Sequence, residues 1–343
     1  MLQENSFMQG KQSIGLGTPV YIRQSASIVG KKEGQGPLGK LFDVIGEDDM
    51  FGGSCWEEAE STLQKEAVWL VLQKAGITID EVRYLFAGDL LGQSIASSFG
   101  LSTYGTALFG LYGACSTSAL SLCLGSICVA GGFADQVLCV TSSHFASAEK
   151  EFRFPLDYGN QRPLSASWTV TGSGAFLLAK KREKGTRAMI TGLTPGRIVD
   201  FGIKDSMNMG ACMAPAAADT IDRHLKDFGR TPEYYDKIIT GDLGSVGQQA
   251  LIDLLREKNT DISQLHTDCG IEIYDSGTQD THAGGSGCGC AATVLSAYIL
   301  KNLEEKIWKR VLFVPTGALL SKTSFNEGKS VPGIAHGVVL EAV

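Results

Sequence analysis

The hydrophobic pattern of the chain contains one long segment without charge. No Asp, Glu, Lys or Arg occurs from Leu90 to Ala134, and residues 108–134 are apolar enough to raise the question of a membrane-spanning helix. Gly113 and Ala114 predict a turn within this segment. The stretch that follows, residues 116–130, would extend only about 22 Å as a helix, short of a ~30 Å hydrocarbon core. We therefore predict a helix over 116–130 that is buried inside the protein.

Two segments of the chain carry the same pattern. Residues 72–90 align without gaps with residues 225–243. Each segment is typical of a helix that ends at a glycine and is followed by a short turn and then an apolar strand. The repeat indicates that the chain contains two copies of one α/β unit. The identical positions are Leu72/Leu225, Gly76/Gly229, Thr78/Thr231, Gly88/Gly241, Asp89/Asp242 and Leu90/Leu243.

A second correspondence lies further along each copy. A turn of small residues opens a helix at Gly113-Ala-Cys-Ser-Thr-Ser and again at Gly287-Cys-Gly-Cys-Ala-Ala, and a strand follows each helix. Alternating helices and continuous apolar strands are typical of mainly parallel sheets covered by helices. We predict an α/β protein with two such sheets, one in each half. The polar stretch 180–186 divides the chain into halves 1–183 and 184–343.

Charge and length narrow the class of protein. The chain has 343 residues, enough for two units of ordinary size, with a net charge of −7 and a pI near 5.3. Its Lys and Arg residues are scattered, which excludes the basic stripe of a nucleic-acid-binding protein but permits a local cluster for a small anion. The N-terminal segment lacks a basic region followed by an apolar one, so we expect a soluble chain without a secretory signal.

Glycine and cysteine add two further expectations. Glycine accounts for 42 of the 343 residues, and these glycines do not follow a collagen-like period. We therefore expect them in tight turns and close backbone contacts. The nine cysteines are an odd number and form no CxxC pair, which favours reduced and mostly buried thiols.

Cys115 is the first candidate for chemistry. It lies in the turn that opens the predicted helix, where the helix dipole and free backbone N–H groups favour a thiolate and could hold an anion. Ser116 would supply one of these N–H groups. The alternative is a small buried hydrophobic side chain, which we expect for Cys123, Cys128 and Cys139.

Further candidates follow the strand after this helix and lie in the second half. His144, Lys150 and Arg153 come just past the carboxyl end of that strand, where ligands bind in α/β sheets, although a solvated charged loop is the alternative. His282 lies in the glycine-rich loop 281–289. It is a candidate general base, and the alternative is a turn histidine whose ring hydrogen-bonds within the loop. No string of Asp and Glu resembles a calcium loop, so no metal site is predicted.

These segments resemble those of the thiolase superfamily. The resemblance rests on the Cys115 turn, on Trp168-Thr-Val-Thr-Gly-Ser-Gly-Ala-Phe-Leu-Leu178 and on Thr281-His-Ala-Gly-Gly-Ser-Gly-Cys-Gly, which together span most of the chain. It implies a thiolase-like fold of two pseudo-repeated βαβαβ halves in five layers, ordered α-β-α-β-α, and a homodimer.

The chain departs from the superfamily where catalytic partners belong. Condensing members carry His-Gln-Ala-Asn where this sequence has Thr240-Gly-Asp-Leu-Gly-Ser245, and thiolases carry a second cysteine where it has Val314-Pro-Thr-Gly-Ala-Leu-Leu320. Loss of a general base alone costs ~10²–10⁴ in rate. We therefore expect that the protein is not an enzyme, and that Cys115 and His282 are vestigial residues of a retained pocket.

A narrower resemblance covers the whole chain. A family of thiolase-like sporulation proteins of spore-forming bacilli has similar segments: residues 142–164, Asp280-Thr-His-Ala-Gly-Gly-Ser-Gly and the Cys115 turn. This resemblance implies a peripheral protein of the channel assembly in the spore inner membrane, with the other channel membrane proteins as partners. Its ligand would be dipicolinic acid (pyridine-2,6-dicarboxylate) or the calcium chelate, taken up in sporulation and released on germination. No cofactor is implied beyond calcium that the ligand carries. The expected ligand-binding residues are Cys115, Ser116, His144, Lys150, Arg153 and His282.

Two alternatives stay open. An acyltransferase or condensing enzyme would use Cys115 as the thioester nucleophile together with His282. A purely structural partner of membrane proteins would tolerate substitutions in the pocket but not on its surface.

Overall fold

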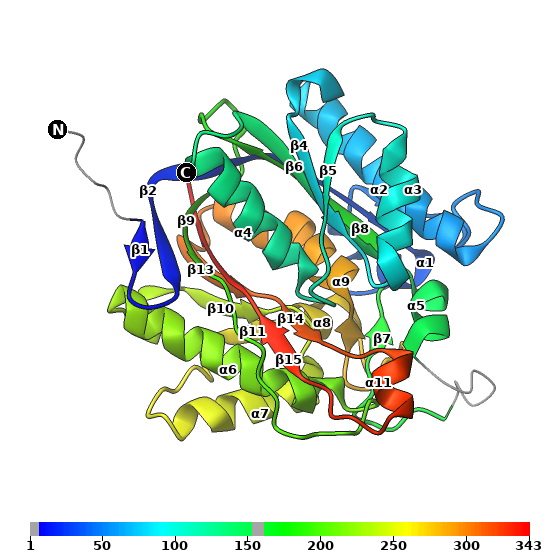
Figure 1. Cartoon of the computed structure of the whole chain (residues 1–343), viewed down its shortest axis with the longest axis vertical. Helices are drawn as coiled ribbons and strands as arrows, with labels where there is room; N and C mark the ends of the chain where they lie inside the picture. Colours follow the sequence, from blue (N-terminus) through cyan, green and yellow to red (C-terminus); the bar gives the residue numbers. More distant parts are fainter. Residues whose placement is uncertain (1–6, 153–160) are drawn as a thin grey trace.

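A computed structural model describes residues 7–152 and 161–343, and its centre is one large sheet (Figure 1). The first half of the chain supplies β2 (Ser13–Val29), β4 (Tyr84–Gly88), β5 (Ala107–Gly110), β6 (Gln136–Ser143) and β8 (Gly172–Ala179). The second half supplies β9 (Ala188–Thr194), β10 (Lys237–Thr240), β11 (His266–Asp268), β13 (Arg310–Val314) and β16 (Gly337–Glu341). The predicted boundary at 183/184 falls in the connection between β8 and β9.

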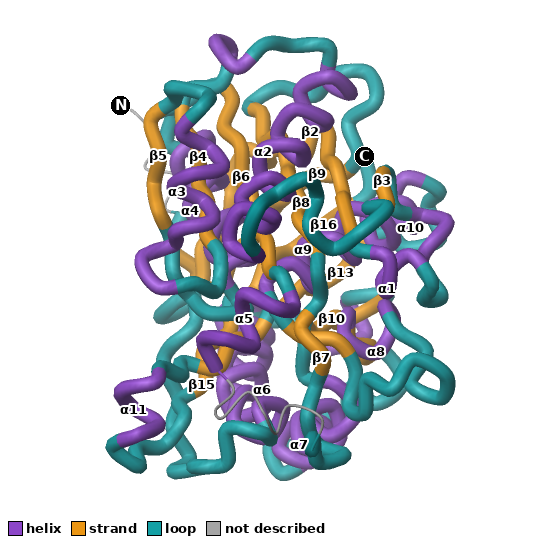
Figure 2. Tube along the Cα trace, turned by 90° about the vertical axis from the view of Figure 1, so that its right-hand side faces the viewer, coloured by secondary structure: helices purple, strands orange, loops and turns teal. Residues whose placement is uncertain are grey.

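The strand order shows the duplication directly. The sheet runs β11-β10-β13-β16-β9-β2-β8-β6-β4-β5, so each half places its five strands in the same order. Figure 2 shows β5, β4, β6 and β8 side by side in that order. From the outer strand of each half inward, two parallel strand pairs are followed by two antiparallel pairs. The repeat seen in the sequence therefore extends to the whole topology.

The predicted pair of separate, mainly parallel sheets was wrong in both respects. β2 and β9 pair antiparallel, for example Val20 with Ile190, and join the two half-sheets into one. Each of these strands ends its own half-sheet, and an unpaired edge would leave backbone N–H and C=O groups without partners. Pairing between the equivalent edges satisfies these groups, and no local sequence signal reports it.

The helices of the repeat match residue by residue. α2 (Trp56–Ala75) and α6 (Met209–Phe228) begin and end at equivalent positions of the alignment. Gly76 and Gly229 end them with φ of 66° and 60°, left-handed conformations that glycine adopts without steric cost. The predicted helix–glycine–strand unit is confirmed in both halves.

Helices cover the sheet in three layers. α4 (Thr117–Ala130) and α9 (Cys288–Val294) pack with inward-facing strand residues of both halves, such as Phe86 and Phe313. The alternate residues face outward, Leu85 toward α2 and Leu312 toward α6. α3 (Ile95–Ser102) lies beside α2, and α7 (Gly244–Arg256) beside α6. The two half-sheets, joined by the pairing of β2 with β9, lie on either side of α4 and α9 and form the two β layers of the predicted order α-β-α-β-α.

The uncharged segment forms α4 as predicted, with Ser116 as its N-cap. Among the helices of the described ranges, none has both the length and the apolarity to cross a bilayer.

The shorter elements are β1 (Met8–Gln9), α1 (Lys31–Gly34), β3 (Val44–Ile45), α5 (Phe145–Phe152), β7 (Trp168–Thr169), α8 (Cys269–Ile273), β12 (Gly285–Ser286), α10 (Leu300–Glu304), β14 (Thr316–Ala318), α11 (Lys322–Asn326) and β15 (Gly333–Ala335).

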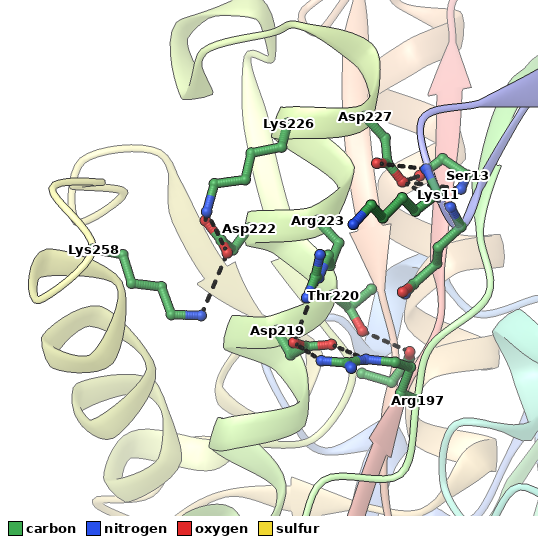
Figure 3. Close-up of polar contacts among 12 residues, drawn as sticks. Lys11, Ser13, Arg197, Asp219, Thr220, Asp222, Arg223, Lys226, Asp227 and Lys258 are labelled. Atoms are coloured by element: carbon green, nitrogen blue, oxygen red, sulfur yellow. Dashed lines mark hydrogen bonds and ion pairs between the residues drawn. The ribbon is translucent and has the colours of Figure 1, made fainter.

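The hairpin of β1 and β2 docks onto the end of α6 through one carboxylate (Figure 3). Asp227 accepts hydrogen bonds from the backbone N–H groups of Lys11 (3.1 Å), Gln12 (3.2 Å) and Ser13 (3.0 Å). Gly10 turns left-handed here with φ of 57°, and a Cβ on it would lie 2.0 Å from the carboxylate. The first strand of the chain is thus tied to the second half.

Candidate functional site

Cys115 lies at the floor of a small cavity where the two halves meet. Ala114, with φ of 50°, makes the sharp turn that places the thiol just before α4. The cavity encloses about 20 Å³, roughly the room of one water molecule. Its lining comes from both halves of the chain: Leu90, Ala114, Cys115, Glu149, Phe152, Thr169, Met209, Ser286, Ala318 and Leu320.

Two glycines let the second half approach the thiol closely. A Cβ on Gly317 would lie 2.4 Å from the carbonyl oxygen of Gly113 and 3.2 Å from the nitrogen of Cys115. Gly287 has φ of 103°, and a Cβ on it would lie 2.6 Å from the hydroxyl of Ser143. Any larger side chain at either position would push the two halves of the site apart.

The nearest polar partner of Cys115 is Asp242, which follows β10. This buried carboxyl group is close enough to the thiol for each group to shift the pKa of the other. The carboxyl also accepts from the N–H of Gly287 (3.0 Å) and the hydroxyl of Thr316 (2.7 Å). These two hydrogen bonds hold the carboxyl group of Asp242 in place near the sulfur.

These surroundings keep the thiol protonated. Burial raises the pKa of Cys115 well above its usual value, and the negative charge of Asp242 raises it further. Burial also raises the pKa of Asp242 to about 7. The expectation of a thiolate at the helix N-terminus is therefore wrong. The N–H groups of Ser116 and Thr117 donate to the carbonyls of Gly113 and Ala114 within the turn, so the helix end offers the sulfur little compensation.

Ser116 is adjacent to the thiol but is occupied by the same turn. Its hydroxyl is fully buried and donates to the carbonyl of Gly113 at 2.6 Å. Ser116 supports the geometry of the turn, and its role toward a ligand stays a prediction.

His282 is directed away from the cavity. Its Nδ1 lies 2.8 Å from the carbonyl oxygen of Pro163, and its Nε2 lies 3.1 Å from a carboxylate oxygen of Asp280. Both ring nitrogens therefore have partners outside the cavity that Cys115 lines. The two candidate catalytic side chains are not brought together.

The candidates after β6 are also held elsewhere. His144 is buried, its Nε2 lies 2.7 Å from the carbonyl oxygen of Asp49, and burial lowers its pKa. Lys150 pairs with Glu57 at 2.6 Å. Arg153 lies outside the described residues. Neither His144 nor Lys150 lines the Cys115 cavity, so their binding role stays a prediction.

Asp242 is the site residue that sequence reasoning missed. It is one of the identical positions of the repeat, paired with Asp89. Asp89 caps the segment that follows β4, where it accepts from the N–H groups of Leu91 and Ser97. The duplicated aspartate thus has a local role in one half and faces the thiol in the other. The repeat contained the signal, but it could not tell the two roles apart.

A larger groove adjoins the Cys115 cavity and shares Leu90, Phe152 and Leu320 with it. The groove encloses about 560 Å³, a size typical of small-molecule sites. Lys322 and Glu151 lie 3.6 Å apart at its rim. The complete lining is Leu90, Leu91, Gly92, Gln93, Tyr112, Glu151, Phe152, Leu319, Leu320, Ser321, Lys322, Thr323 and Ser324.

The duplicated halves and a cysteine in the turn before the central helix define a thiolase-like α/β protein. Solved structures agree on the fold. Human mitochondrial 3-ketoacyl-CoA thiolase in complex with CoA aligns with a TM-score of 0.59 and 13% identity, covering 96% of this chain and 99% of that one. The 3-oxoacyl-acyl-carrier-protein synthase III of Aquifex aeolicus aligns with a TM-score of 0.51 and 15% identity, covering 97% and 100%.

The chain belongs to the stage V sporulation protein AD (SpoVAD) family, whose model matches residues 10–341. It is 42% identical over 334 residues to the stage V sporulation protein AD of Bacillus subtilis (strain 168), covering 97% of this chain and 98% of that protein. The family is named for sporulation, whereas the structural neighbours are enzymes.

Proposed function

We propose that this protein is a non-catalytic ligand-binding component of sporulation, and that its ligand is dipicolinic acid, bound chiefly as the calcium chelate. The observation that carries the proposal is the pairing of the Cys115 thiol with the buried carboxyl of Asp242. A thioester nucleophile must be a thiolate, and this environment opposes one.

The rest of the site supports a role without acyl transfer. His282 has partners at both ring nitrogens, so neither is available to take the thiol proton. Asp242 is a poor substitute because transfer of the proton to it would create a buried thiolate beside a buried neutral acid. The pocket is retained while its base is lost.

The charges around the groove favour the chelate over the free dianion. Glu149 lines the cavity, Glu151 lines the groove where Lys322 pairs with it, and Asp242 is close to Cys115, so the acidic groups outnumber the one lysine. A free dicarboxylate would be repelled by these groups, whereas calcium dipicolinate carries no net charge. No cluster of three or more metal-binding side chains occurs in the part of the chain that the structure describes, so calcium would arrive with the ligand.

The setting we propose is the channel assembly of the spore inner membrane. The family membership supports a sporulation role. The membrane proteins of that assembly are the partners that we propose. The protein would bind at the membrane through these partners rather than through a span of its own.

Calorimetric titration of the full chain with dipicolinate, with and without Ca²⁺, tests the proposal. We expect saturable binding that is tighter with Ca²⁺ and about tenfold weaker in Tyr112→Ala, because Tyr112 lines the groove. Phe133→Ala, at an exposed position outside the groove, is the matched control and should bind as the parent does. The absence of saturable binding in both conditions would overturn the proposal.

An acyltransferase remains the second candidate because Cys115 precedes α4 in the fold of condensing enzymes. Incubation with acyl thioesters followed by intact-mass measurement separates the two. An adduct that disappears in Cys115→Ala, but persists in the buried-cysteine control Cys123→Ala, would establish acyl transfer.

A further inference from the structure

A second pocket lies on the outer face of the first half, away from Cys115. It encloses about 140 Å³, enough for one apolar side chain, between β3 and α2. Buried Ile28 and Leu63 form part of its lining. At its rim, Val44 is 42% exposed and Trp69 is 53% exposed, so two apolar side chains face the solvent beside an apolar pocket. We call Val44, Phe51, Glu66 and Trp69 the Trp69 surface.

The loop that precedes α2 holds Phe51 at this pocket by a specific backbone geometry. Phe51 has φ of 47°, a left-handed conformation that is rare for an aromatic residue. The carboxylate of Asp48 accepts from the N–H groups of Met50 (2.8 Å) and Phe51 (3.0 Å) and fixes the turn. The ring covers Gly46, where a Cβ would lie 2.5 Å from it. Strained residues of this kind cluster at binding sites.

The loop is also acidic. Every charged residue from 41 to 64 is Asp or Glu. Glu57 pairs with Lys150, and Asp43 pairs with Lys74. Glu47, Asp48 and Asp49 are exposed and form no ion pair with any residue in the described ranges. Figure 1 shows this loop, in blue, projecting from the side of the molecule at the start of α2.

We propose that the Trp69 surface binds a basic, apolar segment of a partner protein, with one apolar side chain in the pocket and lysine or arginine against residues 47–49. The exposed aromatic ring supplies a contact of the kind that anchors protein interfaces, and the acidic loop supplies the complementary charge. Cytoplasmic segments of membrane proteins carry an excess of Lys and Arg, so such segments have the required chemistry.

The same charges disfavour the other occupants. A second copy would bring its own residues 47–49 against the first, and like charges repel. An anionic lipid surface attracts basic rather than acidic patches. This inference is independent of what the Cys115 groove binds, because the two sites share no lining residue.

Fluorescence anisotropy with the full chain tests the assignment. The probe is a short fluorescein-labelled peptide of lysine and leucine in an amphipathic helical repeat, and its counterpart has glutamate in place of lysine. We expect saturable binding of the lysine peptide only, weakening as salt is raised. Trp69→Ser and the double variant Glu47→Lys/Asp49→Lys should each weaken binding at least about tenfold.

Matched controls keep the result decisive. Phe133→Ser removes an aromatic ring elsewhere that is more exposed than Trp69, and Glu257→Lys/Glu327→Lys makes the same change of net charge outside the surface. Both should bind the peptide as the parent does. Should Trp69→Ser unfold, Val44→Asn tests the same pocket. Three results would overturn the proposal. The surface variants could bind the lysine peptide as well as the parent does, the parent could bind the glutamate peptide more tightly, or it could bind anionic vesicles instead of the peptide.

Discussion

At the scale of single residues, the chemistry of the site is set by two side chains from opposite halves of the chain. Cys115 comes from the turn before α4, and Asp242 follows β10. Each is buried, which disfavours its charged form. The charge of Asp242 raises the pKa of Cys115 further, whereas Cys115 lowers the pKa of Asp242 and only partly offsets the effect of burial there. These surroundings therefore disfavour a thiolate at Cys115.

Replacing this carboxyl should make the thiol more reactive. In Asp242→Asn we expect iodoacetamide to alkylate Cys115 about threefold faster or more at pH 8, because loss of the negative charge favours the thiolate. Peptide mapping by mass spectrometry in a Cys55→Ser background measures the rate without the exposed thiol. Glu149→Gln, which lines the same cavity, is the matched control. An unchanged rate in Asp242→Asn would show that burial alone protects the sulfur.

The close approach at Gly317 should be equally sensitive. Gly317→Ala should lower the free energy of unfolding by roughly 1–3 kcal/mol, because its Cβ would press on the backbone of the Cys115 turn. Gly92→Ala lies in the adjoining groove with open space around it and should change stability by less than about 0.5 kcal/mol. Urea unfolding of both variants measures the difference, and equal effects would contradict the packing described for this turn.

Sequence patterns identified the Cys115 turn but not the state of its thiol. The glycine–cysteine–helix pattern is local, so the position of Cys115 could be predicted. The protonation of the sulfur depends first on its burial and then on Asp242, which is distant in the chain, and both arise only in the fold. His282 was correctly recognised as belonging to a glycine-rich loop, yet its orientation depends on Asp280 and Pro163.

At the scale of elements, the helices were predictable and the strand pairing was not. The equal extents of α2 and α6 follow from a repeat that is visible in the sequence and from glycines that end both helices. The antiparallel contact of β2 with β9 joins two edges that no periodicity relates. The same holds for the docking of the β1–β2 hairpin, because it depends on distant partners: Asp227 on α6, together with Pro195 and Thr194.

Removal of this carboxylate should loosen the hairpin. Asp227→Ala should cost about 1–2 kcal/mol of unfolding free energy, after allowance for solvent screening of a half-buried group. Hydrogen exchange should increase at residues 11–13, which lose their acceptor. Asp253→Ala, an exposed acid on α7, is the control. Unchanged exchange at residues 11–13 in Asp227→Ala would contradict the docking role.

The same carboxylate predicts a dependence on pH. Burial raises the pKa of Asp227, but the N–H groups of Lys11, Gln12 and Ser13 outweigh it and lower the pKa overall. Its contribution is therefore present above the unfolded value of about 4 and is lost as pH falls through the lower folded value. The stability difference between the parent and Asp227→Ala should shrink below pH 4, and a constant difference from pH 7 to pH 2 would contradict this.

At the scale of the whole molecule, β5 leaves one edge of the sheet open. All four of its residues are exposed, including Leu108 and Phe109, and its outer edge pairs with no strand in the described part of the chain. Such an apolar edge is a template for pairing with another chain. We predict that two copies associate through β5, which extends the sheet across a homodimer.

Light scattering coupled to size exclusion tests this prediction. The parent should elute with the mass of a dimer at micromolar concentration, and Leu108→Lys should be a monomer because a charge would be buried at the interface. Leu164→Lys, at a more exposed leucine outside the sheet, should leave the dimer intact. A monomeric parent protein, or a dimeric Leu108→Lys variant, would contradict the prediction.

For the molecule as a whole, we propose that a thiolase-like site serves as a binding pocket. The most direct measurement is a crystal structure of the protein soaked with calcium dipicolinate. We predict density for the chelate in the groove lined by Gln93, Tyr112 and Leu320, beside an unmodified Cys115. Density only at another surface, or a groove that stays empty at saturating chelate, would contradict the central claim.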